Sequence, residues 1–449
     1  MDWIFIAQVV NLLIFLISLY FYIQRKPFFL LPTLFIAMGL HGFNFLLGTL
    51  WFPFKVVNLI IFLYLLTRIK PKNPEKSVYI SFSVIFFLGF VNALFNLPDK
   101  GFNTGLLQGP LLRPIIQLYT YFSTFSLIVF IPFVTRNYNT LLRLDKYYMK
   151  ISEFIIIIGF IHFLFLKADI PFMPIIRSSG ENNEIAKFSA KGIIMTRIYG
   201  FTGEPKTLGS FLLPYFFVSF YKYLNGFINK NKRYHAFMLI LSLFVIIQTY
   251  SSAVLIGLGL ALLLGFILKL LSLKNKIIIR SFYVLVALFL IGNQLIEREG
   301  NYEKISFLQF LEARTIGRVQ EEIVERGEIT VLNNIMSKAA LPIMGFGPGM
   351  YVFSSEEMVY SKGINKIDSG WVTIFSDLGI TGILLFLAVI IMVTVNRKHI
   401  LKKYYVLYNS YLFGLISVAT TMLGNYEPIL FPLFLGFIFA VYKLNNAEK

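Results

Sequence analysis

The stretch "RIYGFTGEP" (197–205) places two charged side chains within a chain that is otherwise mostly apolar. Arg197 presents a planar fork of N–H donors that suits a phosphate or pyrophosphate, although an interfacial arginine reaching toward lipid phosphates would occupy the same position. Glu204 is a carboxylate that can accept a proton as a general base. Because Pro205 follows it and suits the first turn of a helix, Glu204 alone is more simply explained as a complement to the helix dipole.

A second pair of candidates lies in "LEARTIGRVQEEIVERG" (311–327). Arg314 and Arg318 are four residues apart, so they would share one face of a helix and could grip a pyrophosphate together. Arg318 and Glu322 have the same spacing, and a solvated, salt-bridged helix face is therefore the simpler interpretation of this stretch alone.

Two further motifs lie closer to the C-terminus. Asp368, in "KIDSGW" (366–371), comes directly before an apolar run. It can cap the helix that begins there, by itself or through Ser369, or it can serve as a base in place of Glu204. The glycine-rich "GFGPG" (345–349) lacks the Lys and Ser of a phosphate-binding loop, and we predict a tight turn there.

Several other kinds of site are excluded or disfavoured by the sequence. It contains no GxxxxGK[ST], HExxH or GxSxG motif and no Asp-x-Asp pair for a metal-bound nucleotide sugar. It has no cysteine, so disulfides and thiolate metal sites are excluded. His162 is the clearest ionisable residue inside an apolar run, and an isolated histidine there is more often structural than a proton relay, which weakens a transporter interpretation.

Membrane-spanning helices must position these motifs. The 449 residues are 57% hydrophobic and 14% charged, and the apolar runs are long enough to cross a hydrocarbon core as helices, without the alternation of a β-barrel. We predict an all-α, polytopic helical bundle of about thirteen spans, near 3–23, 28–50, 54–68, 77–96, 113–135, 150–168, 207–222, 234–249, 251–270, 277–295, 371–395, 403–423 and 429–443.

Lys and Arg are concentrated in alternate connections between these spans. With the N-terminus outside, the inner connections and the C-terminal tail hold 24 of the 41 basic residues. Because cytoplasmic loops accumulate cations, this orientation is the expected one, with the C-terminus inside. The formal charge of +18 then divides into about +20 inside and −2 outside, so that it requires no nucleic-acid partner.

Two outer connections are long, and the candidate residues fall in them. The predicted organisation is an N-terminal group of spans, a first long outer loop, a central group of spans, a large outer loop and a C-terminal group of spans, over 1–168, 169–206, 207–295, 296–370 and 371–449. The Pro, Gly and Asn content of the first loop argues against one continuous helix, whereas 302–338 favours a helix.

The order of these motifs resembles the O-antigen ligase and O-antigen polymerase family of bacterial envelope glycosyltransferases. That family has Arg-x-x-Gly-x-x-x-x-Pro leading into a span, a large periplasmic loop with arginines, a Gly-x-Gly-x-Gly turn, and a polar residue before an L-G-x-x-G span. Here the corresponding stretches are "RIYGFTGEP", "ARTIGRV", "GFGPG" and "DSGWVTIFSDLGITG", in that order between Arg197 and Gly382.

The resemblance implies a polymerase in the bacterial inner membrane. It would join polyprenyl-pyrophosphate-linked oligosaccharide repeat units into O-antigen or capsule at the periplasmic face, without a metal or other cofactor. Arg197, Arg314 and Arg318 would bind the substrate pyrophosphate. The catalytic base does not follow from the resemblance, and we infer from the residues themselves that it is the carboxylate of Glu204 or Asp368. Besides the two lipid-linked substrates, the resemblance allows membrane lipids and a chain-length regulator as partners.

Two alternatives stay open. Ligases of this family carry a histidine base where this chain has Asp368, and none of the four histidines lies in a long outer loop, which favours the polymerase over a ligase that transfers glycan to lipid A core. The other alternative is a lipid-linked oligosaccharide flippase or other transporter, for which mid-membrane charges and internal repeats would be expected.

Overall fold

The structure is a computed structural model of the chain. It describes residues 3–46, 49–50, 52–68, 75–98, 109–173, 175–177, 180–182, 187–190, 193–227, 231–268, 270–271, 328–354, 369–425 and 427–449. Of the candidate residues, Arg197 and Glu204 are described, whereas Arg314, Arg318 and Asp368 lie outside the described residues.

The described part of the chain is predominantly helical. Its α-helices are α1 (Trp3–Ile23), α2 (Leu30–Gly39), α3 (Pro53–Arg68), α4 (Glu75–Phe95), α5 (Leu112–Phe125), α6 (Leu127–Val134), α7 (Tyr138–Lys167), α8 (Pro205–Leu224), α9 (Lys232–Gln248), α10 (Ser252–Ile267), α14 (Glu328–Lys338), α16 (Gly370–Asn396), α17 (Lys402–Thr421) and α18 (Leu430–Glu448). Short 3-10 turns are η1 (Pro27–Phe29), η4 (Gly200–Thr202), η6 (Pro342–Met344), η7 (Met350–Ser354) and η8 (Arg397–His399).

Strands occur only in connections within this part of the chain. Three antiparallel pairs join β1 (Phe45–Leu46) to β2 (Thr49–Leu50), β3 (Ile175–Arg177) to β4 (Gly180–Asn182), and β5 (Lys187–Ala190) to β6 (Ile193–Thr196). The last two pairs lie in the first long loop, in agreement with the prediction that this loop is not one helix.

The helices have the composition and length of membrane spans. Within the described residues, six segments are long and apolar enough to cross a membrane, and three shorter apolar helices accompany them. Large apolar side chains also point outward: Leu12 on α1 is 52% exposed and Ile391 on α16 is 61% exposed. Helices that are apolar on their outward faces as well as inside are typical of a lipid-facing surface. A helical membrane protein is thus supported, while the number of thirteen spans stays a prediction.

Most predicted spans coincide with helices, but one is wrong in extent. The run 28–50 is helical only through η1 and α2, because the helix ends at Gly39 and the chain then turns into the β1–β2 hairpin. The run 113–135 is divided at Ser126 into α5 and α6. The predicted span 277–295 lies outside the described residues.

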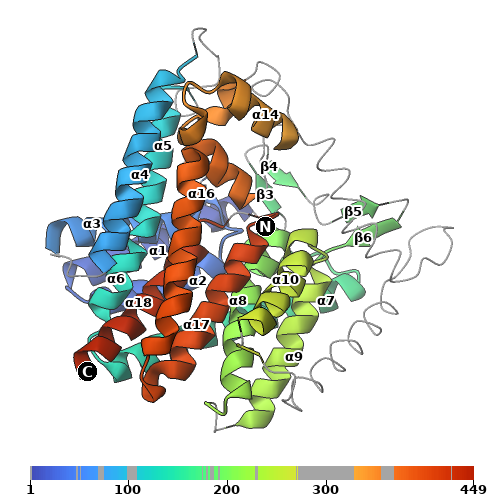
Figure 1. Ribbon diagram of the computed structural model, residues 1–449. Coiled ribbons are helices and arrows are strands. Elements are labelled where there is room, and N and C mark those ends of the chain that lie inside the picture. Colours follow the sequence, from blue (N-terminus) through green and yellow to red (C-terminus); the bar gives the residue numbers. More distant parts are fainter. Residues whose placement is uncertain are drawn as a thin grey trace.

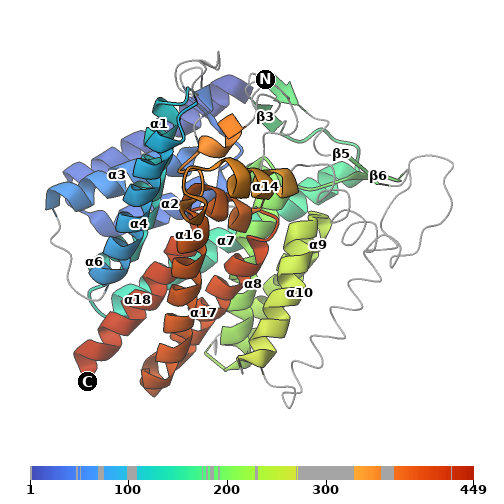
Figure 2. The ribbon, with the colours of Figure 1, turned by 45° about the horizontal axis from the view of Figure 1, so that its top comes forward.

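Helices α8 and α17 form the centre of the bundle. Nearly every residue of α8 is buried, and α17 packs against α8, α10 and α18 (Figure 1). We call the end of the bundle at which α8 begins the site end, and the opposite end the far end. Figures 1 and 2 show α14 and the β3–β4 pair toward the site end, with the C-terminus at the far end.

The "GFGPG" stretch is a tight turn, as predicted. Its three glycines have φ values of 72°, 94° and 71°. The turn docks on α16, where the N–H of Phe346 donates to the Ser376 carbonyl at 2.7 Å. At that point α16 is interrupted by Gly379, whose φ of 65° is non-helical, and a Cβ on Gly379 would lie 1.9 Å from the Ile343 carbonyl oxygen. The glycine turn therefore packs against the first part of α16.

The N-terminus of α16 is capped by Ser369, which is one of the two caps that the sequence predicted. The Ser369 hydroxyl accepts a hydrogen bond from the Val372 N–H at 3.3 Å, so Ser369 is the N-cap residue. The described helix α14 falls within the range 302–338 for which a helix was predicted.

Candidate functional site

The turn that carries Arg197 and Glu204 is anchored to α7 by His162. The backbone N–H groups of Tyr199 and Gly200 both donate to Nδ1 of His162, at 3.2 and 3.1 Å. Because an atom that accepts two hydrogen bonds cannot carry a proton, His162 is neutral with its proton on Nε2. The ring also stacks on Phe172 at 4.1 Å between centroids. His162 is thus a structural residue, which agrees with the simpler interpretation of its position.

A close approach of two backbones fixes the same turn to the end of α2. Gly203 has a φ of 77°, and a Cβ at this position would lie 2.6 Å from the Cα of Gly42. The N–H of Gly42 donates to the Phe201 carbonyl at 2.9 Å. This contact explains why the apolar run 28–50 is not one helix, since the chain must leave α2 at Gly39 to reach the turn.

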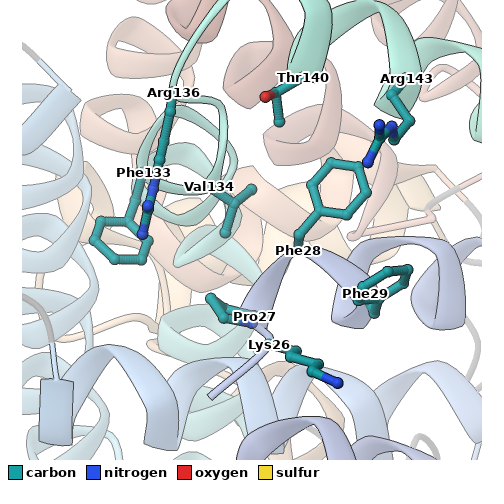
Figure 3. Close-up of a pocket in the computed structure, with 9 residues that line it drawn as sticks. All are labelled: Lys26, Pro27, Phe28, Phe29, Phe133, Val134, Arg136, Thr140 and Arg143. Carbon is teal, nitrogen blue, oxygen red and sulfur yellow. The ribbon is translucent and has the colours of Figure 1, made fainter. Parts of the chain in front are cut away.

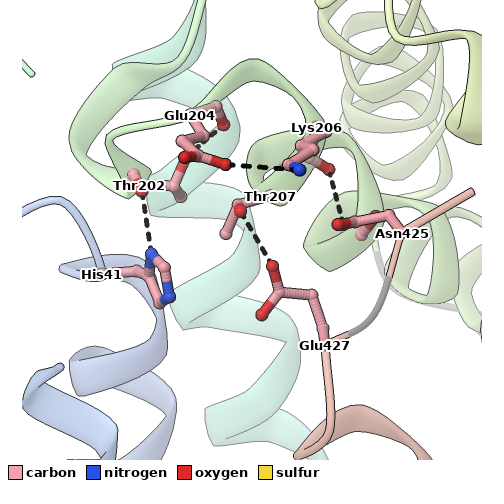
Figure 4. Close-up of polar contacts among 8 residues, drawn as sticks. His41, Thr202, Glu204, Lys206, Thr207, Asn425 and Glu427 are labelled. Carbon is pink, nitrogen blue, oxygen red and sulfur yellow. Dashed lines mark hydrogen bonds and ion pairs between the residues drawn. The ribbon is translucent and has the colours of Figure 1, made fainter. Parts of the chain in front are cut away.

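His41 adds a side-chain contact to this junction. Its Nδ1 lies 3.1 Å from the Thr202 carbonyl oxygen, which can only accept, so Nδ1 donates this hydrogen bond. The ring stacks on Phe52 at 4.2 Å. His41 lies outside the long loops in sequence, yet it is in contact with the turn (Figure 4).

Glu204 and Lys206 flank the first residue of α8. Glu204 is the N-cap residue by backbone geometry, with φ −141° and ψ 138°, and its side chain makes no cap hydrogen bond. Its Oε2 lies 3.9 Å from Nζ of Lys206, and the two side chains are 22% and 23% exposed. Both charged groups are therefore accessible at the start of a helix that is otherwise buried.

A second glutamate reaches the start of α8 from the connection between α17 and α18. Oε1 of Glu427 accepts a hydrogen bond from the Thr207 hydroxyl at 2.8 Å. Asn425, in the same connection, donates to the Ser210 hydroxyl at 2.8 Å. Figure 4 shows His41, Glu204 and Glu427 gathered around the first turn of α8. The site thus combines residues from the turn after α2, the 197–205 turn, the start of α8 and the α17–α18 connection.

Sequence reasoning missed His41, Lys206 and Glu427. One signal was present for Glu427, because "NYEP" places a Glu-Pro pair just before an apolar run, as "TGEP" does. For His41 nothing local indicated the contact, which joins residues 161 positions apart. Arg197 lies at the beginning of the turn that leads to Glu204 and is partly buried there.

A separate polar cluster surrounds Asp377 on α16. This buried carboxylate accepts hydrogen bonds from the Tyr121 hydroxyl at 2.6 Å and from the Gly349 N–H at 3.0 Å. Asn92 donates to the Gly345 carbonyl at 2.7 Å beside it. These bonds tie the glycine turn to α4, α5 and α16, so Asp377 acts in packing and does not reach the first turn of α8 among the described contacts.

An apolar cavity lies next to the turn, between α2 and α7. Its volume is about 540 Å³, and it runs from Lys150 past Phe154 and Ile158 to Phe201 in the turn. Over the described residues, no three His, Asp or Glu side chains gather in a way that could hold a metal ion. No family model, curated protein or solved structure matches the chain.

Proposed function

We propose that the protein is a glycosyltransferase that joins polyprenyl-pyrophosphate-linked oligosaccharide repeat units into a long surface polysaccharide at the periplasmic face of a bacterial inner membrane. The observation that carries the proposal is the anchored stretch that leads into α8. Arg197 is partly buried at the beginning of this stretch, and Glu204 and Lys206 are partly exposed where the helix starts. The motif order that resembles the O-antigen polymerases runs through this same turn.

The proposed reaction is a direct displacement at the anomeric carbon of the growing chain. The acceptor sugar hydroxyl loses its proton to a carboxylate and its oxygen bonds to the anomeric carbon, while the bond from that carbon to the pyrophosphate breaks. The lipid pyrophosphate leaves with the bonding electron pair, and the configuration of the anomeric carbon inverts.

The candidate residues have distinct parts in this scheme. Arg197 binds the departing pyrophosphate through its donor fork, and the Lys206 ammonium adds positive charge there. Arg314 and Arg318 complete the pyrophosphate site, as the resemblance implies. The N-terminus of α8 contributes a partial positive charge to the same region.

Glu204 is the base that we favour over Asp368. Its carboxylate is partly exposed at the start of α8, where it lies 3.9 Å from Nζ of Lys206. Glu427 also lies at the first turn of α8, where its Oε1 accepts the Thr207 hydroxyl, and it is the second described carboxylate to test. The apolar cavity of about 540 Å³ beside Phe201 offers a surface for one isoprenoid tail.

The test measures long-chain polysaccharide made by membranes that contain Arg197→Ala, Arg318→Ala or Asp368→Asn at equal protein levels. Arg197→Lys keeps the charge but loses the fork, and we expect it to restore little activity. Lys167→Ala removes a cation at the site end of α7 outside the turn and serves as the matched control. Full-length chains from the Arg197→Ala protein would contradict the site.

The purified protein distinguishes the three functions by product. Two carrier-linked repeats become one longer carrier-linked chain if the protein is a polymerase. Glycan appears on lipid A core if it is a ligase. Movement of the lipid-linked substrate across liposomes without a new glycosidic bond would instead establish a transporter.

A further inference from the structure

A small basic cavity lies at the far end of the bundle, away from the candidate site. It has a volume of about 260 Å³ and lies between η1 and the α6–α7 junction. Lys26 precedes η1, Arg136 lies in the connection between α6 and α7, and Arg143 lies in the second turn of α7. In the predicted orientation this is the cytoplasmic end.

The charge of this cavity is positive only. Lys26, Arg136 and Arg143 line it, and no carboxylate does. Over the described ranges, none of these three cations forms an ion pair. The acid nearest to Arg143 along α7 is Asp145, which is buried and already bonded to Lys222 and to the Tyr411 hydroxyl at 2.7 Å. An anion is therefore the ligand that complements the cavity.

The floor between the cations is apolar. Figure 3 shows Phe28 and Val134 between the side chains of Arg136 and Arg143, with Lys26 on a further side. Phe29, also in the lining, is 36% exposed. A small hydrated anion gains nothing from such a floor, whereas an anion that carries hydrocarbon gains from burying it.

The neighbourhood supplies a source for that hydrocarbon. Helix α1 ends at Ile23, three residues before Lys26. Ile23 is 63% exposed, and Leu16 on the same helix is 50% exposed. A lipid-facing surface thus runs along α1 toward the cavity. Basic pockets between membrane helices on the cytoplasmic side are suited to anionic lipid headgroups.

We propose that this cavity binds the phosphate of an anionic membrane phospholipid, with its acyl chains along the apolar surface of α1 and η1. Lys26, Arg136 and Arg143 lie on different sides of the apolar floor (Figure 3). The phosphate and the glycerol part of one headgroup would therefore contact different cations. The site is independent of the proposed polymerase reaction and lies at the opposite end of the bundle from it.

The experiment is native mass spectrometry of the full chain in detergent, titrated with phosphatidylglycerol. The double variant Arg136→Ala/Arg143→Ala should bind it about 30-fold more weakly, because each cation near a membrane surface contributes roughly a factor of five. The matched control is Lys232→Ala/Arg233→Ala, which removes two exposed cations at the same end, on α9, outside the cavity. Its affinity should be unchanged.

Three comparisons decide the outcome. Phosphatidylcholine with the same acyl chains should bind no better to the wild type than to the double variant. Inorganic phosphate should not compete at equal concentration, and effective competition would overturn the lipid assignment in favour of a free anion. Equal weakening by both double variants would show only general surface charge. If the alanine protein does not fold, Arg136→Gln and Arg143→Gln tested singly should each weaken binding about fivefold.

Discussion

The two ends of the bundle each bring a lysine and a carboxylate together, but they do so in different ways. At the far end, Lys222 and Asp145 are bonded directly, and their side chains are only 2% and 10% exposed. At the site end, Lys206 and Glu204 are 3.9 Å apart and 22–23% exposed. The first pair satisfies itself inside the protein. The second pair is partly exposed at the surface, and exposure to another molecule is a property that a substrate site requires.

The largest effect is expected at the far end. Lys222→Ala leaves the Asp145 carboxylate buried with the Tyr411 hydroxyl but without its cation, which should destabilise the protein by about 3–5 kcal/mol. Thermal unfolding in detergent measures the change. The double variant Lys222→Met/Asp145→Asn removes both charges and should recover most of the loss. A single variant as stable as wild type would show that the pair is not the structural element described above.

A slightly smaller loss is expected where the turn meets α2. Gly203→Ala introduces a Cβ 2.6 Å from the Cα of Gly42 at a residue with positive φ, and we expect about 3 kcal/mol of destabilisation with loss of activity. Gly226→Ala is the matched control, since Gly226 also has positive φ, at 66°, but has nothing within 4 Å. It should cost about 1 kcal/mol and leave activity intact. If both variants lost similar stability and activity, the close approach of Gly203 to Gly42 would not explain the effect of Gly203→Ala.

Local sequence patterns predicted the helices well and the site only in part. The apolar run 3–23 is α1, and the Glu-Pro pair at 204–205 marks the start of α8, because such signals act within one turn of a helix. The prediction of one helical span over 28–50 was wrong for a non-local reason, because Gly42 packs directly against Gly203. Apolar content alone does not reveal such a contact.

The residues that sequence reasoning missed share this cause. His41 contacts Thr202, and Glu427 contacts Thr207 across 220 positions of sequence. A single sequence contains no signal for a pairing at that range. Among the described residues, Arg197 and Glu204 could be proposed because they lie within one continuous segment, whereas Arg314, Arg318 and Asp368 were proposed from the order of the motifs. The glycine turn was predicted correctly, because its spacing of glycines is itself the local signal.

The next effect separates the two glutamates of the site. Glu204→Gln should lower the rate of chain elongation about 100-fold if this carboxylate accepts the proton, with little change in stability because the side chain is partly exposed. Glu427→Gln keeps an oxygen that can accept the Thr207 hydroxyl, and it should lower the rate much less. Elongation assays at matched protein levels give the comparison. The opposite ranking would move the base to Glu427.

The smallest effect compares two helix caps, one at each end. Ser369 caps α16 at the site end, and Asn137 caps α7 at the far end by accepting a hydrogen bond from the Thr140 N–H at 2.9 Å. Alanine at either position should cost about 1 kcal/mol, because each removes a partner from the first turn of a helix. Only Ser369→Ala should also slow chain elongation, by several-fold, since Ser369 directly follows Asp368 and fixes where the large loop enters α16. Thermal unfolding and the elongation assay on the same two proteins measure both quantities. Equal slowing of elongation by the two variants would mean that activity follows stability alone. That result would contradict the assignment of the substrate site to one end of the bundle.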